Sequence, residues 1–105
     1  MNRIAALRAQ LGGPRDGAML RYSLGSALLE AGGAAEAIAH LRAAVDRDAG
    51  YSAAWKLLGK ACLDAGDAPA AADAWRRGIA AAEARGDVQA AKEMRVLLKR
   101  LRARD

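Results

Sequence analysis

Residue types that carry catalysis are scarce in this sequence, which contains one histidine, His40, and one cysteine, Cys62. Neither has partners at the spacing that a metal ion or a nucleophile–base pair needs, so we interpret them as a helical histidine and a buried, inert thiol. Gly59-Lys60 matches the end of a phosphate-binding loop, but the other diagnostic positions hold alanine and the pair lies within a predicted helix. The sequence therefore predicts no enzyme, no metal site and no cofactor.

Basic side chains are the other candidates for recognition chemistry, and Lys56 and Lys60 form the first group. They are four residues apart and share one face of a helix, where two ammonium groups repel each other unless an anion lies nearby. The pair is a candidate site for an acidic side chain or a terminal carboxylate of a ligand. The alternative is that both lysines only solvate the helix.

A second basic group lies near the C-terminus. The formal net charge is +5, and residues 76–105 hold nine basic and four acidic residues, so the whole excess lies there. At 100° per residue, one stripe of the last helix carries four of these bases beside an apolar stripe: Lys92, Arg95, Lys99 and Arg102. This basic stripe is an alternative binding site, for nucleic acid or an anionic membrane surface. We disfavour it because no aromatic residue interleaves with the bases and the apolar stripe is needed to cover the fold.

The elements that position these residues are predicted to be helices. Hydrophobic residues make up 53% of the 105-residue chain, and 29 of them are alanine, while β-branched residues are few, which favours an all-α fold. No apolar run is long enough to span a membrane and no export signal begins the chain, so we expect a cytoplasmic protein. Glycine-containing turns separate the helices, which are expected at about 3–11, 16–31, 34–47, 51–65, 68–84 and 88–103.

The helical pattern repeats after 34 residues. Leu24-Gly25 returns as Leu58-Gly59, and Leu41 returns as Trp75. Small residues recur where two helices would cross, with large residues beside them, as expected for repeats that bury their apolar faces against neighbours. The sequence thus predicts one domain, 1–105, in four parts: a lone helix in 1–14, helix pairs in 18–51 and 52–85, and a capping helix in 86–105.

These positions resemble the tetratricopeptide repeat family, whose pattern combines an aromatic residue, Leu-Gly and a large residue in the first helix with small and large residues in the second. Residues 52–85 match it with Trp55, Leu58-Gly59, Cys62, Ala71, Trp75 and Gly78, and residues 18–51 with Leu24-Gly25, Leu28, Ala37, Leu41 and Ala44. The resemblance implies a right-handed α-α superhelix, a helical repeat solenoid that acts as a protein-binding scaffold. Ala49 and Glu83 stand where the family often has proline, so the sequence does not define where the second helix of each repeat ends.

The resemblance also implies a concave groove, formed by the first helix of each repeat, that binds a peptide or helical segment of a partner protein. The candidates carried over to this sequence are Met19, Tyr22, Ser26, Leu29, Lys56, Lys60, Leu63 and Met94, with Ala53, Ala90 and Leu97 on the same surface. Tyr22 and Met94 would supply apolar contacts, and the two lysines would attract an acidic group. Some family members clamp a carboxylate, but none of the expected residues occurs at the five clamp positions, which are Tyr22, Ser26, Leu57, Asp87 and Ala91. We therefore expect a protein–protein interaction module without that clamp.

Overall fold

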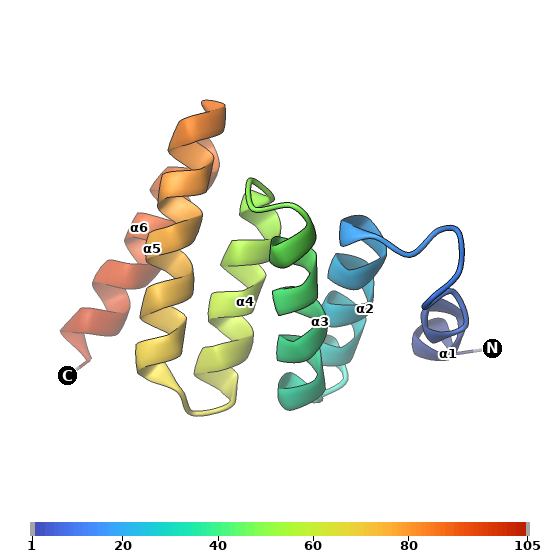
Figure 1. Ribbon diagram of the computed structural model, residues 1–105. Helices are drawn as coiled ribbons and strands as arrows, with labels where there is room; N and C mark the ends of the chain where they lie inside the picture. The colour runs from blue at the N-terminus through green and yellow to red at the C-terminus, as the bar shows by residue number, and fades with distance from the viewer. Residues whose placement is uncertain (1, 105) are drawn as a thin grey trace.

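A computed structural model describes residues 2–104, so positions 1 and 105 of the predicted domain lie outside the described residues. Within that range the chain forms six α-helices and no strand, which confirms the predicted all-α class. From α2 to α6 the helices follow one another as antiparallel neighbours (Figure 1). They are α1 (Arg3–Arg8), α2 (Ala18–Glu30), α3 (Ala34–Arg47), α4 (Ser52–Asp64), α5 (Ala68–Arg85) and α6 (Val88–Ala103).

The helices from α2 onward form two layers. Each packs on the next in the sequence, and α4 also contacts α2 and α6, so these three form one layer while α3 and α5 form the other (Figure 1). Among residues 2–104, none of the helices has both the length and the apolar character needed to cross a bilayer.

Glycines allow the two helix pairs to cross closely. A Cβ atom on Gly25 of α2 would lie 2.6 Å from Cγ of Leu41 on α3, and one on Gly59 of α4 would overlap the indole of Trp75 on α5. The Trp75 Nε1–H donates to the backbone oxygen of Lys56 at 3.0 Å, which fixes the indole over α4. Two glycines inside helices, each costing about 1 kcal/mol relative to alanine, thus have a packing reason.

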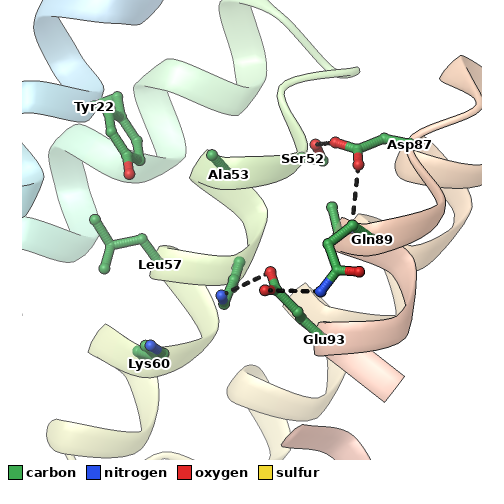
Figure 2. Close-up of a pocket in the computed structure, with 10 residues that line it drawn as sticks. Tyr22, Ser52, Ala53, Leu57, Lys60, Asp87, Gln89 and Glu93 are labelled. Carbon is green, nitrogen blue, oxygen red and sulfur yellow. Dashed lines mark hydrogen bonds and ion pairs between the residues drawn. The ribbon is translucent and has the colours of Figure 1, made fainter. Parts of the chain in front are cut away.

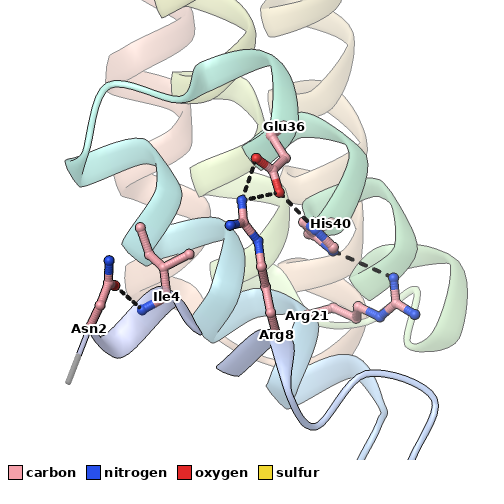
Figure 3. Close-up of polar contacts among 6 residues, drawn as sticks. All are labelled: Asn2, Ile4, Arg8, Arg21, Glu36 and His40. Atoms are coloured by element: carbon pink, nitrogen blue, oxygen red, sulfur yellow. Dashed lines mark hydrogen bonds and ion pairs between the residues drawn. The ribbon is translucent and has the colours of Figure 1, made fainter. Parts of the chain in front are cut away.

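A polar network joins the loop after α1 to the first helix pair. Asp16 accepts two hydrogen bonds from Arg21 of α2, both at 2.9 Å, and the Arg21 guanidinium lies 3.5 Å from Nδ1 of His40 on α3. Arg8 of α1 pairs with Glu36 of α3 beside this histidine (Figure 3). Arg21 occupies the repeat position of Trp55, whose Nε1–H donates to the backbone oxygen of Ala49 in the loop before α4. In the first helix pair an arginine thus takes the place of the tryptophan that binds a helix to its preceding loop.

The end of α5 changes the register of the last helix. With Glu83 in place of a proline, α5 runs to Arg85 and has 18 residues against 14 in α3. It ends at Gly86, whose φ of 73° provides the left-handed conformation of a helix stop. This extra turn displaces α6 along the sequence relative to the 34-residue repeat.

The buried face of α6 reflects that displacement. Ala54 and Ala61, which are buried in α4, correspond to the buried Ala91 and Leu98 of α6, and each pair is separated by 37 positions. We infer that the register of α6 is shifted by three residues, almost one helical turn. Residues carried over to α6 at a spacing of 34 are therefore displaced by almost one turn, and one of them, Met94, lies in the core.

Candidate functional site

A hollow of about 350 Å³ lies between α2, α4 and α6. In Figure 2, α4 forms its floor, Tyr22 of α2 lies on one side, and Gln89 and Glu93 of α6 lie on the other. Its lining consists of Tyr22, Ser52, Ala53, Lys56, Leu57, Lys60, Asp87, Gln89, Ala90 and Glu93.

A second hollow of about 240 Å³ continues along α4 and α6. It shares Lys56, Lys60 and Glu93 with the first hollow and adds Val96, Leu97 and Arg100. Because the two hollows have these three residues in common, we treat them as one channel and call their combined lining the α4–α6 groove.

An ion pair divides this groove. Nζ of Lys56 lies 3.0 Å from Oε1 of Glu93, and Oε2 of Glu93 accepts a hydrogen bond from Gln89 at 3.4 Å. The hydrogen bond from Lys56 is the main reason why the pKa of the Glu93 carboxyl is lowered from its usual value. Each carboxylate oxygen of Glu93 thus accepts one hydrogen bond, and the charge of Lys56 is compensated.

The second acidic residue of the groove, Asp87, also accepts hydrogen bonds. Its side chain caps α6 by accepting from the backbone N–H of Ala90 at 3.1 Å, and its other oxygen accepts from the hydroxyl of Ser52 at 3.0 Å. Lys60 and Arg100 are exposed, and neither forms an ion pair with any residue between 2 and 104. The uncompensated charge of the groove is therefore positive.

Tyr22 lines the α2 side of the groove, and Tyr51 packs against it. The rings of Tyr22 and Tyr51 lie 5.1 Å apart with an interplanar angle of 33°, a tilted contact that holds Tyr22 in place. Both side chains are half-buried, and burial raises the pKa of the Tyr51 hydroxyl. The first hollow thus has an aromatic side, whereas Arg100 lines only the second hollow.

Comparison with known proteins gives this architecture a family. The model of the tetratricopeptide repeat family matches residues 4–52 and, in a second alignment, residues 22–87. The chain belongs to the tetratricopeptide repeat family. Proteins of this family generally mediate protein–protein interactions and act as scaffolds rather than as enzymes.

Two relatives match nearly the whole of this tetratricopeptide repeat chain. The TPR repeat-containing protein PA0015 of Pseudomonas aeruginosa is 49% identical over 98 residues, which are 93% of each chain. The solution structure of protein BPP2914 from Bordetella parapertussis is 43% identical and covers all of this chain and 91% of its own, with a TM-score of 0.86. The structural match supports the predicted right-handed α-α superhelix.

The groove candidates named from the sequence fall into three groups. Tyr22, Lys56 and Lys60 come together at the first hollow with Ala53 and Ala90, and their role in binding stays a prediction. The others on α2 and α4 lie outside the lining of both hollows; they are Met19, Ser26, Leu29 and Leu63. Met19 is 75% exposed at the start of α2, while Leu29 and Leu63 pack against the core.

The prediction for Met94 was wrong. Its side chain is completely buried, and a Cβ atom on Gly78 of α5 would collide with its sulfur, so it belongs to the core between α5 and α6. The cause is the shifted register of α6, which turns Met94 toward α5. At a spacing of 37 from Lys56 and Lys60, the positions that line the groove are Glu93 and Leu97.

Ala90 and Leu97 of α6, which were carried over from the repeat, line the two hollows, whereas sequence reasoning missed Glu93, Val96 and Arg100. The signal that points to them is the helix stop at Gly86, because it makes α5 longer than α3 and so ends the strict 34-residue spacing before α6.

The predicted basic stripe lies on another side of α6. All four of its residues are exposed, and Arg95 pairs with Glu83 of α5. None of them lines the α4–α6 groove. The neighbouring apolar stripe is buried as predicted, with Ala91, Met94, Leu98 and Leu101. Whether the basic stripe binds an anionic polymer stays a prediction.

The two residues considered for catalysis, Cys62 and His40, lie in the hydrophobic core and in a polar network, respectively. Cys62 is 1% exposed, and burial raises the pKa of its thiol. His40 lies in the network with Arg21 and Glu36, where burial is the main reason for its lowered pKa. In the part of the chain that the structure describes, no three His, Cys, Asp or Glu side chains gather in an arrangement that would hold a metal ion.

Proposed function

We propose that this domain binds a peptide or helical segment of a partner protein along the α4–α6 groove. The observation that carries the proposal is the hollow of about 350 Å³ between three helices of one layer, with Lys60 exposed at its edge. The established role of the family, protein–protein interaction, supports a protein ligand. The position of the groove within the domain is our own proposal.

Affinity in this groove would come from its apolar lining. Tyr22, held by Tyr51, offers a rigid aromatic surface, and Ala53 and Ala90 leave space beside it for a ligand side chain. A preformed aromatic surface loses little conformational freedom on binding, which is why aromatic residues dominate interface energies. We therefore expect an apolar side chain of the ligand to contact Tyr22.

The charged side chains of the groove would orient the bound ligand. Lys56 is already paired with Glu93, and Lys60 is not paired within the described chain, so a carboxylate of the ligand gains more from Lys60 than from Lys56. An exposed ion pair contributes about 0.2–1 kcal/mol, so Lys60 would modulate affinity rather than create it.

A peptide selection tests the proposal. Peptides of 12 residues from a random phage-displayed library are selected on the wild-type domain, and their binding sites are mapped by backbone amide chemical shifts. We expect the largest shifts around Tyr22, Ala53 and Ala90. Tyr22→Ala should weaken the selected peptides at least fivefold, because it removes the aromatic surface, and circular dichroism checks that this variant keeps its fold.

A matched charge control separates the groove from the basic stripe. Lys60→Glu and Lys99→Glu reverse the same charge at exposed positions, one in the groove and one in the stripe. We expect Lys60→Glu to change peptide affinity several-fold and Lys99→Glu to leave it within about twofold. A failure to select any peptide, or shifts confined to the stripe and abolished by Lys99→Glu, would reject the proposal in favour of the alternative surface.

A further inference from the structure

The second hollow of the groove differs in charge from the first. Its lining has three cationic side chains and one acidic side chain, which is Glu93. Glu93 is ion-paired with Lys56, which leaves Lys60 and Arg100 as the two cations of this hollow without an ion pair among residues 2–104. The first hollow, in contrast, is lined by two lysines and two carboxylates.

We call this cationic part the basic end of the groove; it consists of Lys60, Val96, Leu97 and Arg100. Its cations come from two helices, Lys60 from α4 and Arg100 from α6. Between them lies an apolar floor, because Leu97 is half-buried and Val96 is an exposed large hydrophobic residue, with 47% of its surface accessible. An apolar floor bordered by two unpaired cations complements a ligand that presents an apolar side chain next to carboxylates.

The Lys56–Glu93 pair makes the basic end the preferred place for a carboxylate. A ligand carboxylate at the middle of the groove would share the charge of Lys56 with Glu93, which lies 3.0 Å from it, and would be repelled by Glu93. Lys60 and Arg100 offer their charge without such competition. The selectivity of the groove for acidic ligands is therefore concentrated at one end.

We propose that the basic end binds an internal acidic segment of a partner protein, with carboxylate side chains at Lys60 and Arg100 and an apolar side chain on the floor. This inference rests on the proposed function and names the chemistry of the ligand. An internal segment fits because the basic end shares lining residues with the first hollow, so the ligand chain continues toward Tyr22. A protein ligand fits better than a polyphosphate because the adjoining hollow contains Asp87 and Glu93, which repel a continuous row of phosphates.

The test uses two synthetic peptides with acetylated N-termini and amidated C-termini. The acidic peptide has the sequence Glu-Glu-Leu-Leu repeated three times, and its neutral counterpart has glutamine in place of each glutamate. Binding to the whole 105-residue domain is followed by amide chemical shifts at 50 and 300 mM salt. We expect the acidic peptide to shift the amides of Lys60, Leu97 and Arg100, to bind at least fivefold more tightly than the neutral peptide, and to weaken several-fold at the higher salt concentration.

Charge reversal makes the test specific for these two residues. Lys60→Glu/Arg100→Glu should lose the acidic peptide and gain binding of a third peptide, in which lysine replaces each glutamate. Both positions are exposed, so the fold should persist, and circular dichroism verifies this. Lys99→Glu/Arg102→Glu, which reverses two charges of the basic stripe on the same helix, is the matched control and should bind the acidic peptide as the wild type does.

Each contrary outcome has a distinct meaning. Equal binding of the acidic and neutral peptides in the groove would overturn this inference and leave the proposed function intact. Loss of binding in the stripe variant rather than in the groove variant would overturn it too, as would the absence of shifts with millimolar acidic peptide. Tighter binding of a version with a free C-terminal carboxylate, by tenfold or more, would replace the internal segment with a chain terminus.

Discussion

The close crossing of α4 and α5 makes Gly59 a sensitive test of the packing. Gly59 is buried, and a Cβ atom at this position would fall well inside van der Waals contact with the indole nitrogen and ring carbons of Trp75. Trp75 is 1% exposed and its Nε1–H is bonded to the oxygen of Lys56, so the ring has little room to move. We therefore predict that Gly59→Ala destabilises the domain, although alanine is the better helix former.

The magnitude follows from three opposing effects. Alanine improves the intrinsic helix propensity by about 1 kcal/mol. Overpacking the crossing costs about 1–3 kcal/mol, and weakening the bond from Trp75 to Lys56 costs about 1 kcal/mol more. The net expectation is a loss of about 1–3 kcal/mol in the free energy of unfolding, or on the order of 10 °C in the midpoint of thermal unfolding for a domain of this size.

Thermal and urea unfolding followed by circular dichroism measure this loss, with two other glycines for comparison. Gly17→Ala serves as the control without a close contact, because Gly17 has extended backbone and a Cβ atom there would have no neighbour within 4 Å; its loss should stay below about 1 kcal/mol, the effect of a weaker N-cap on α2. Gly25→Ala should fall between the two, since the atoms it meets, at 2.6 and 2.8 Å, belong to the flexible side chain of Leu41. A Gly59→Ala variant as stable as the wild type would refute the close crossing.

Two further predictions concern the cap of α6 and the histidine network. Asp87→Ala should lower the free energy of unfolding by about 1 kcal/mol, because it removes the helix cap at Ala90, and urea unfolding that shows no loss would contradict this role. Because burial, aided by the charge of Arg21, lowers the folded-state pKa of His40, the unfolded state binds more protons as the pH falls through about 6.5, so thermal stability should decrease between pH 7.5 and 5.5. His40→Gln should reduce this decrease; an unchanged pH dependence would show that another group causes it.

Local rules predicted most of the fold. Glycines at the helix ends, such as Gly32 and Gly66 with φ of 85° and 83°, gave the turns directly. The 34-residue spacing of Gly25 and Gly59 identified the two crossings, because glycine within a helix needs a packing reason. These features depend on backbone conformation and residue size, which are properties of the sequence at each position.

The site was less predictable, because it depends on how elements are placed relative to one another. The sequence placed Lys56 and Lys60 on one face of a helix, and that relation holds within α4. It gave no sign that Lys56 would meet Glu93, since this contact depends on the length of α5 and the rotation of α6. A repeat period specifies equivalent positions only while each unit has the same length.

The extra turn of α5 accounts for the change in the predicted anion site. With a spacing of 34, Met94 would face the groove and Lys56 and Lys60 would be the free pair. With the spacing of 37, Met94 is buried and α6 presents Glu93 to Lys56, so that lysine is compensated. The same rotation brings Arg100 to the second hollow beside Lys60. One turn of helix thus replaces a cationic pair on a single helix by a pair shared between α4 and α6, and this makes the charge of the groove depend on the packing of its last helix.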